Sequence, residues 1–394
     1  MSNIASGMNN VTAAFPVDEY DARVEAVRKE MTARQLDTLL ITSPENIYYL
    51  VGLSHQGYFA FTMLLFPLEG QPLLVTRSLE RVTVTEQAPH VEHVGFADHE
   101  QPWTAVVRAV RRAGVTSSHV GVELGNMFFP PLVWEAVREQ LPEVEWANAS
   151  GIVEDIRQVK SPLEIASIRR AAALSDRSIR AGLEVAGVGV NEREIAAEVM
   201  RSMVAGGSEH PGFVPLVRSK RYLLHEHTTW RDALLVPGDS VFMELSASVH
   251  RYHAPLARMA YVGGTPPGIA RSAEIALAGL HAVCAALRPG ATSGEVYAAW
   301  QAVMDDALGA GTYGRHHCGY SVGIGFPPSW IGVGTMVGLR PGGTIEIRER
   351  MVFHVLSWLL GAGVPDYVLS DTVIVAPTGS ELLTTTRRVP IVID

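Results

Sequence analysis

The sequence predicts a two-domain α+β protein: a small α/β domain, followed by a larger domain in which helices cover a sheet with approximate two-fold symmetry. Three observations support this prediction. Short apolar runs alternate with amphipathic segments up to residue 158, and a strong helix-start signal follows at Ser161. Beyond that signal, a helix–helix–strand–strand pattern occurs twice, which is typical of an internally repeated sheet with helices on one face. We therefore expect domains at residues 1–158 and 159–394.

Short strands account for the first domain. Residues 36–42 form a buried apolar run, and residues 119–123 form another strand-like run. Residues 62–66 and 72–76 flank the turn sequence Leu68-Glu69-Gly70. Two strand-like runs joined by a glycine-containing turn predict a hairpin. The mixture of these strands with amphipathic segments predicts the α/β domain.

Capping signals and strand blocks define the second domain. A capping residue is followed three positions later by glutamate before three helices, at Ser161 with Glu164, Asn191 with Glu194, and Thr292 with Glu295. Such a pair satisfies the free N–H groups of a helix's first turn, and the proline after Ser161 suits the first helical position. Each helix pair precedes strand-like sequence, at residues 240–262 and 344–374. The two halves predict the pseudo-two-fold sheet.

Composition restricts the class of protein. The 394 residues are 47% hydrophobic and 19% charged, with a net charge of −9, as in a soluble enzyme and without the basic stripe of a nucleic-acid binder. No apolar run reaches the roughly 18 residues that span a bilayer. Residues 351–364 come nearest but contain His354. The N-terminus lacks the pattern of a signal peptide, and two cysteines make no disulfide framework. We expect a cytoplasmic protein with neither membrane nor nucleic-acid partners.

The densest group of polar residues lies between two arginines, and comprises Arg218, His225, Glu226, His227, Glu244, Arg251, Tyr252, His253 and Arg258. Glu244 lies within the apolar run 241–245. A carboxylate is costly to bury unless it is paired, and burial raises its pKa, so such groups are enriched at functional sites. The alternative is that Glu244 faces solvent on an edge strand.

Two histidines of this group, His225 and His227, are two positions apart and would share one face of a strand. One interpretation is a pair of metal ligands, with a third from His316, His317 or His354. The other is that they bind no metal, as most histidines do not. Dinucleotide-binding, P-loop and Ser or Cys nucleophile motifs are absent from the sequence.

Three segments, residues 156–165, 236–245 and 319–325, resemble the creatinase and Xaa-Pro peptidase family. The first is similar to its interdomain signature, the second to the strand that delivers its first metal carboxylate, and the third to its Gly-His-x-x-Gly element. The resemblance implies the family's pita-bread fold for the second domain. It also implies a homodimer in which the partner's N-terminal domain helps close the site, near His55, Gln56, Tyr58 and Phe59.

The family's metal ligands are not retained in this sequence. Metal-dependent members use two Asp, one His and two Glu. The corresponding positions here are Glu244, Pro255, Tyr320, Leu356 and Ser370. Proline and leucine have no ligand atoms, and neutral serine and tyrosine are poor ligands for hard cations. The resemblance therefore implies a protein with no metal and no other cofactor.

Metal loss also occurs in creatinase itself and in the ectoine hydrolases, and the second branch is more similar. Residues 251–255 resemble its Arg-Tyr-His-x-Pro, and residues 319–320 and 327–330 resemble its Gly-Tyr and Pro-Pro-x-Trp. The spacing from His227 to Glu244 also matches, which aligns His227 with the branch's catalytic histidine. Residues 349–351 and 361–369 depart from the branch, and this leaves the substrate open.

The resemblance implies a metal-independent hydrolase of a C–N bond in a small zwitterionic amino-acid derivative, either a cyclic amidine such as ectoine or a guanidino acid such as creatine. His227 is the expected acid/base, and Glu244 is the expected nucleophile or base. The expected substrate-binding residues are Arg218 or Arg258 for a carboxylate, Tyr252 and Tyr320 as hydrogen-bond donors, Trp330 with Phe326 as pocket walls, and His253 and His354.

Each of these interpretations has an alternative in which the residues have a structural or non-catalytic role. The aromatic side chains are equally compatible with simple core packing. The whole second domain is compatible with a non-catalytic module that binds peptides or small ligands, and a conventional metallopeptidase is a third possibility. The pairing of His227 with Glu244 favours an enzyme, because a binding module has no need of an acid/base pair.

Overall fold

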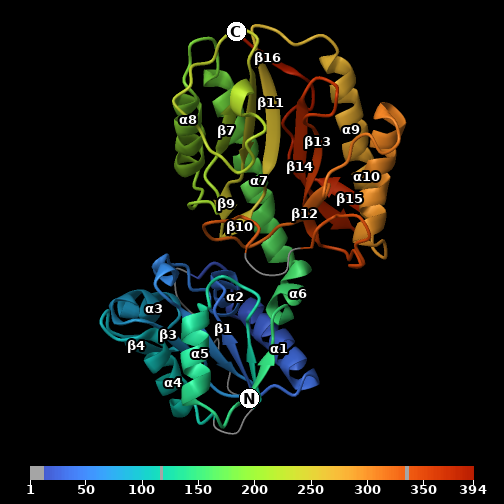
Figure 1. Ribbon diagram of the computed structural model, residues 1–394. Coiled ribbons are helices and arrows are strands. Elements are labelled where there is room, and N and C mark those ends of the chain that lie inside the picture. The colour runs from blue at the N-terminus through green and yellow to red at the C-terminus, as the bar shows by residue number, and fades with distance from the viewer. Residues whose placement is uncertain (1–12, 116–118, 333–336) are drawn as a thin grey trace. The chain divides into compact units, whose positions relative to one another are not determined.

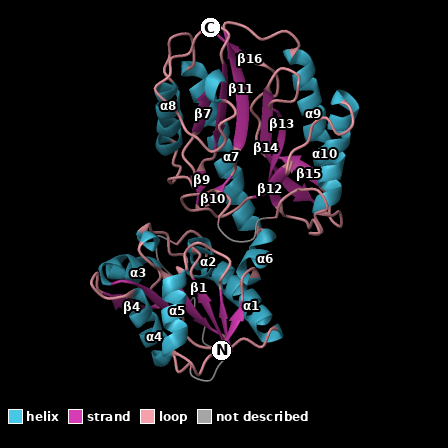
Figure 2. Cartoon of the chain, viewed as in Figure 1, coloured by secondary structure: helices cyan, strands magenta, loops and turns pink. Residues whose placement is uncertain are grey.

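The computed structural model describes residues 13–115, 119–332 and 337–394 (Figure 1). Residues 1–12 lie outside these ranges. The expectation that the chain has no signal peptide concerns this segment. The chain divides into two compact units, one ending at Arg157 and the other starting at Gln158. Each unit has its own sheet and its own helices (Figure 2).

The first unit contains a six-stranded mixed sheet in the order β4-β3-β2-β1-β5-β6. Its strands are β1 (Thr38–Ile41), β2 (Met63–Pro67), β3 (Leu73–Arg77), β4 (Glu92–Phe96), β5 (His119–Val122) and β6 (Glu145–Asn148). The predicted hairpin is confirmed, because β2 and β3 pair antiparallel. The two other predicted strands are also present, as β1 and β5.

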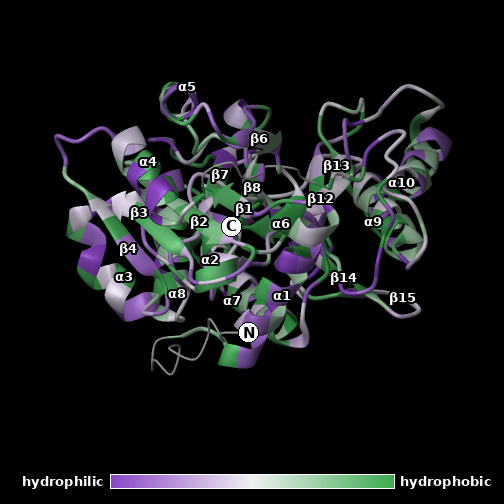
Figure 3. Ribbon diagram, turned by 90° about the horizontal axis from the view of Figure 1, so that it is seen from below, coloured by the Kyte–Doolittle hydropathy of each residue, from purple (hydrophilic) through white to green (hydrophobic). Residues whose placement is uncertain are grey.

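Helices pack around this sheet: α1 (Val17–Ala33), α2 (Pro44–Val51), α3 (Arg81–Gln87), α4 (Pro102–Arg112) and α5 (Pro131–Gln140), with α6 (Ile152–Gln158) at the division. Two short 3-10 turns, η2 (Gly57–Phe59) and η3 (Ser78–Glu80), precede β2 and α3. Val106 and Val110 of α4 are fully buried with Leu65 and Val120 in one core cluster. Figure 3 shows the hydrophobic colouring of β1 and β2 and the mixed colouring of α4, as expected for an amphipathic helix over a buried sheet.

The second unit has an eight-stranded sheet whose main path is β12-β13-β14-β11-β8-β7. These strands are β7 (Leu216–Ser219), β8 (Ser240–Leu245), β11 (Leu256–Val262), β12 (Gly319–Ser321), β13 (Val352–Leu359) and β14 (Tyr367–Ala376). β15 (Gly379–Leu382) pairs with β14, β16 (Ile391–Ile393) pairs with β11, and β9 (Ser248–Val249) with β10 (Tyr252–His253) forms a separate hairpin. Each half contributes three strands to the path, so the predicted pseudo-two-fold sheet is confirmed.

Two helix pairs cover one face of this sheet: α7 (Pro162–Val185) with α8 (Glu192–Ala205), and α9 (Ile269–Ala286) with α10 (Ser293–Leu308) (Figure 1). Close packing requires glycine in both pairs. A Cβ at Gly182 of α7 would lie 2.6 Å from Val199 Cγ2 and 3.2 Å from Met243 Sδ, and one at Gly279 of α9 would lie 2.5 Å from Ser357 Oγ. Since neighbouring residues of a strand point to opposite faces, the residues next to Met243 and Ser357 face away from the helices.

The helix starts agree with the capping signals. Ser161 and Thr292 form complete capping boxes with Glu164 and Glu295. Asn191 is an N-cap, but its side chain accepts from the N–H of Arg193 rather than forming a box with Glu194.

One helix, α9, is long and apolar enough to cross a membrane by length and composition alone. It packs against β13, β14 and α10, which is the position of a core helix. The stretch predicted to come nearest to a membrane span, residues 351–364, contains strand β13 instead.

Candidate active site

The face of the second sheet opposite the helices carries a cross-strand row of side chains. On β8, Glu244 lies opposite Leu216 of β7 and Ala257 of β11. Ala257 lies opposite Ser370 of β14, which lies opposite Leu356 of β13. Because directly paired residues point to the same face, these five side chains form one row across the middle of the sheet.

A second row runs beside the first. Tyr320 of β12 is paired with His354 of β13, which is paired with Thr372 of β14. The Thr372 hydroxyl donates to the carbonyl oxygen of Pro255 at 2.7 Å. Four of the five positions that the resemblance aligns with metal ligands therefore lie within these two adjacent rows, and the fifth, Pro255, is hydrogen-bonded to the second row.

A cavity of about 240 Å³ opens on this face of the sheet. Four of the predicted site residues line it: His227, Glu244, Tyr320 and Trp330. The other lining residues are Phe213, Leu216, Glu226, Arg315, His316, His317, Ile331, Leu356 and Trp358. The cavity is therefore largely apolar and aromatic, with a few polar groups, as small-molecule sites usually are.

Glu244 is the buried carboxylate of the cavity. The residue is 5% exposed, so the prediction of a buried carboxylate is confirmed and the solvent-facing alternative is wrong. Burial raises its pKa to about 7, against the opposing charges of Arg218 and Arg315. A carboxyl group with this pKa exchanges protons near neutral pH, which suits acid/base chemistry.

His227 lies in a turn that follows η4 (Lys220–Tyr222), not on a strand. The predicted strand through His225 and His227 is wrong, because this segment turns and His227 adopts a left-handed φ of 56°. The imidazole stacks on the ring of Phe213, with centroids 6.3 Å apart and planes 19° apart. His227 and Glu244 line the same cavity, His227 from a turn and Glu244 from strand β8.

Tyr320 belongs to a buried chain of hydrogen bonds. The indole N–H of Trp330 donates to the Tyr320 hydroxyl at 3.1 Å, and that hydroxyl lies 2.8 Å from His354 Nδ1. His354 Nε2 lies 2.7 Å from Ser370 Oγ. Burial lowers the pKa of His354 well below its usual value, so its imidazole is neutral. Both ring nitrogens are therefore engaged, Nδ1 with the Tyr320 hydroxyl and Nε2 with the Ser370 hydroxyl. His354 thus fixes the orientation of Tyr320 from beneath the cavity.

Arg218 lies beneath the cavity wall rather than in it. Its guanidinium carbon is 4.2 Å from the ring centroid of Phe242, and its Nη1 donates to the carbonyl oxygen of His225. Phe242 in turn makes an edge-on contact with Trp358, at 5.4 Å between centroids. Burial lowers the pKa of Arg218. The predicted grip of Arg218 on a substrate carboxylate is therefore not supported by its position.

Three further predicted substrate-binding residues do not reach the cavity. The Tyr252 hydroxyl donates to Glu164 Oε1 at 2.6 Å, and His253 Nε2 accepts from the N–H of Gly212 at 3.0 Å. Arg258 forms a buried ion pair with Asp371 at 2.8 Å. It is paired with Met243 across the sheet, and so points to the helix-covered face. The predicted pocket-wall residue Phe326 is also buried outside the cavity, under the guanidinium of Arg251.

The sequence interpretation missed Arg315 and Glu226 as cavity residues. Arg315 lies in the segment between α10 and β12, and its Nη2 is 3.3 Å from Glu226 Oε1. Its guanidinium carbon lies 4.8 Å from the ring centroid of Trp358. The run Arg315-His316-His317 just before β12 was a usable signal. Burial, with the neighbouring charges of His316 and Arg315, lowers the pKa of His317 to about 4.

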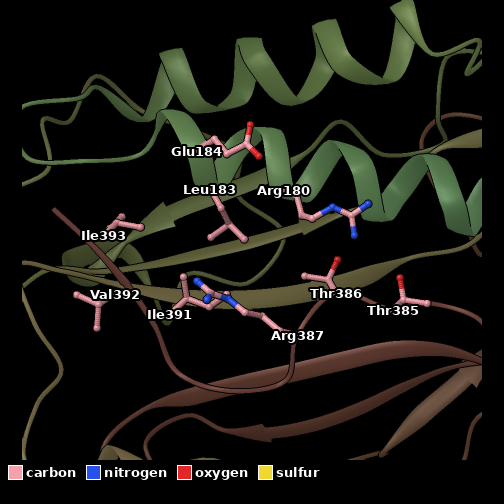
Figure 4. A pocket seen from close by; sticks show the side chains of 9 residues that line it. All are labelled: Arg180, Leu183, Glu184, Thr385, Thr386, Arg387, Ile391, Val392 and Ile393. Carbon is pink, nitrogen blue, oxygen red and sulfur yellow. The ribbon is translucent and has the colours of Figure 1, made fainter.

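A second pocket, of about 380 Å³, lies between α7 and the C-terminal segment (Figure 4). Arg180 and Glu184 of α7 line one side, and Arg387 lies across from them (Figure 4). The hydroxyls of Thr385 and Thr386, which also line it, donate to Asp176 of α7. None of the predicted site residues lines this pocket, so the candidate site is the cavity above Glu244.

Comparison with known proteins defines the class. The profile of the metallopeptidase family M24 matches residues 166–377, and that of the creatinase/prolidase N-terminal domain matches residues 23–159. The chain therefore belongs to the metallopeptidase family M24, and its class is that of the creatinase-type hydrolases with the pita-bread fold.

Individual relatives cover almost the whole chain. An ectoine hydrolase of Halomonas elongata is 28% identical over 95% of this chain and 98% of its own length. A Xaa-Pro dipeptidase of Pyrococcus horikoshii is 24% identical over 94% of this chain and 99% of its own. The crystal structure of a recombinant prolidase from Thermococcus sibiricus has a TM-score of 0.83 at 20% identity, and covers 95% of this chain and 99% of its own.

The family name implies a metal centre, and the residues at the expected ligand positions do not fit one. Glu244 is the single carboxylate among these five positions, and the side chains of Pro255 and Leu356 offer no ligand atom. The hydroxyls of Tyr320 and Ser370 are hydrogen-bonded to His354. Within the described ranges, no group of three or more His, Cys, Asp or Glu could hold a metal ion. Hard divalent cations require several oxygen ligands, which these five residues do not supply.

Proposed function

We propose that this protein is a metal-independent hydrolase that cleaves a C–N bond of a small zwitterionic amino-acid derivative. The observation that carries the proposal is the single buried carboxylate, Glu244, facing a small aromatic cavity together with a histidine. A cyclic amidine such as ectoine or a guanidino acid such as creatine suits this arrangement, because its cationic group can pair with Glu244. The similarity to an ectoine hydrolase supports the same class.

Substrate binding would prepare Glu244 for the reaction. Its pKa of about 7 in the empty cavity reflects burial, and a bound amidinium or guanidinium cation favours the ionised form. The carboxylate then attacks the cationic carbon, or takes a proton from a water molecule that attacks it. In the first version the C–N bond breaks, and water then cleaves the ester bond between Glu244 and the substrate carbon to free the carboxylate. In the second version the attacking water forms the C–O bond directly and the C–N bond breaks. In both versions His227 delivers a proton to the leaving nitrogen.

We expect the purified protein to hydrolyse at least one compound from a panel of cyclic amidines and guanidino acids, and to do so after dialysis against EDTA. The reason is that the residues at the ligand positions of the family, such as Leu356, do not supply a metal centre. Product release by mass spectrometry and elemental analysis of the same sample provide the measurements. A stoichiometric tightly bound ion whose removal abolishes turnover would refute the metal-independent mechanism. Tight binding without turnover of any compound would instead favour a binding module.

We also expect a homodimer, with an exposed apolar surface of the first unit at its interface. Phe59 is 75% exposed, Leu79 61% and Val82 66%. Leu79 and Val82 belong to η3 and α3, which follow each other directly, and the guanidinium carbon of Arg77, just before η3, lies 5.2 Å from the ring centroid of Phe59 in η2. Exposed apolar side chains that gather in this way often mark protein interfaces. In the related dimers implied by the sequence resemblance, this domain helps close the partner's site.

Light scattering at micromolar concentration tests the dimer. The Phe59→Asp variant should shift the mass toward that of a monomer, because a charge is costly to bury at an interface. Leu132→Asp is the matched control, since Leu132 of α5 is 64% exposed in the same unit and lies outside the proposed surface. A monomeric parent protein would contradict the prediction.

A further inference from the structure

Two buried hydrogen-bond donors on the cavity wall have no acceptor. They are Nε of Arg315 and Nε1 of Trp358, and neither has a partner among the described residues. The Arg315 side chain is 10% exposed, and Trp358 is 5% exposed. Both groups donate and cannot accept, and a buried donor without an acceptor is unfavourable. A ligand carboxylate that reached either group would supply the missing acceptor.

The two donors are held on a fixed wall. The Arg315 guanidinium carbon lies 4.8 Å from the Trp358 ring centroid, so the two donor groups come from side chains in direct contact. The carbonyl oxygen of Arg315 accepts from the Tyr297 hydroxyl at 2.7 Å, and that of Trp358 accepts from the Tyr313 hydroxyl at 2.8 Å. Behind Trp358, Phe242 makes the edge-on contact described above. This support pre-organises the donors for an anion.

Arg315 already holds one carboxylate, which a ligand can replace. Its partner Glu226 is 46% exposed, and the ion pair is 3.3 Å long. A half-exposed carboxylate in water contributes little to such a pair. A substrate carboxylate inside the cavity would be less exposed to water than that of Glu226. It can also accept hydrogen bonds from two N–H groups of one arginine at once. Glu226 therefore occupies the position on Arg315 that the substrate carboxylate would take.

We infer that Arg315 is the specificity-determining residue of the cavity, and that it binds the carboxylate of a zwitterionic substrate with Trp358 Nε1 as a second donor. The substrate's cationic group then faces Glu244. This inference rests on the proposed function. It assigns carboxylate binding to Arg315 instead of Arg218 or Arg258, the two residues expected from the sequence. The contact with Arg315 is thereby the feature that separates the carboxylated substrates of the proposed class from simple amidines, guanidines or amines.

Matched ligand pairs test the inference. Ectoine is compared with 2-methyl-1,4,5,6-tetrahydropyrimidine, and creatine with 1,1-dimethylguanidine, because each pair differs by the carboxylate. Dissociation constants are measured by calorimetry on the His227→Ala background, which prevents turnover during the titration. The preference for the carboxylated member is then determined again with Arg315→Gln or Glu226→Gln added. Arg201→Gln serves as the control, since Arg201 also pairs with a glutamate, Glu198, but lies on the exposed side of α8.

Arg315→Gln should reduce the carboxylate preference roughly 10- to 100-fold, the range expected for losing hydrogen bonds between charged groups. Glu226→Gln should increase the preference, because it removes the competing carboxylate, and Arg201→Gln should leave it unchanged. An unchanged preference in Arg315→Gln, or a reduced one in Glu226→Gln, overturns the assignment of Arg315 while the proposed function stands. If neither matched pair binds the parent protein, the proposed function fails and this inference fails with it.

Discussion

Replacing Glu244 with glutamine is expected to reduce kcat by a factor of roughly 10² to 10⁴ or more, the range seen when a positioned acid, base or nucleophile is removed. Glutamine fits the same space but neither attacks a carbon nor takes a proton. It also lacks the negative charge that pairs with a cationic substrate. Steady-state kinetics on the substrate found in the screen measure the effect. Glu274→Gln is the matched control, because Glu274 is 70% exposed on α9, and we expect no change from it.

The stability of the Glu244→Gln variant distinguishes chemistry from folding. Because the folded-state pKa of Glu244 is raised from 4.5 to about 7, the folded protein binds more protons than the unfolded chain between these values. Stability therefore falls as the pH rises through this window. At pH 8 the neutral glutamine should be at least as stable as the ionised parent in a melting curve. A variant that keeps the parent kcat with unchanged stability would contradict the proposed role of Glu244.

Removing the imidazole of His227 is expected to have an effect of similar size, a loss of roughly 10² to 10⁴ in kcat. In the proposed reaction His227 transfers the proton that the leaving nitrogen requires. The kcat of the His227→Ala/Glu244→Gln double variant should be only slightly lower than that of the less active single variant, because both groups act on one reaction coordinate. His225→Ala is the control, since His225 lies on the same turn but contacts Tyr222 and does not line the cavity.

Three outcomes of the His227→Ala and Glu244→Gln measurements would each have a different meaning. Near-parent kcat for His227→Ala at unchanged stability would show that the proposed proton transfer is wrong. Early melting of both His227→Ala and Glu244→Gln would show that the pair is structural, and would favour the binding-module alternative. Fully additive losses would indicate that the two side chains act on separate steps.

Local signals in the sequence were sufficient for much of the fold. The boxes at Ser161 and Thr292 locate two helix starts, because capping depends on residues three positions apart. The hairpin of β2 and β3 is equally local. The apolar neighbours of Glu244 indicated a buried strand, but left open whether its own side chain faces the interior or solvent.

The misplaced residues depended on information that is not local. Whether Arg258 shares a face with Glu244 is determined by the register of β8 and β11, and a shift of one residue reverses the answer. The spacing of His225 and His227 fits a strand, but the chain turns there. Arg315 lies in a connection without periodicity, and its contact with Trp358 joins positions that are far apart in the sequence.

The near-symmetry of the second sheet has a chemical consequence. In the first cross-strand row, Glu244 on β8 and Leu356 on β13 lie one strand away from the central pair β11 and β14, on opposite sides. These are equivalent places in the two halves, but Glu244 is acidic and Leu356 is aliphatic. The first row therefore has an ionisable side chain at one of these places and none at the other. For a flat substrate of the proposed class, the two ends are no longer interchangeable. Under the proposed function, this asymmetry of the row would determine which end of the substrate lies at Glu244, and therefore which C–N bond breaks.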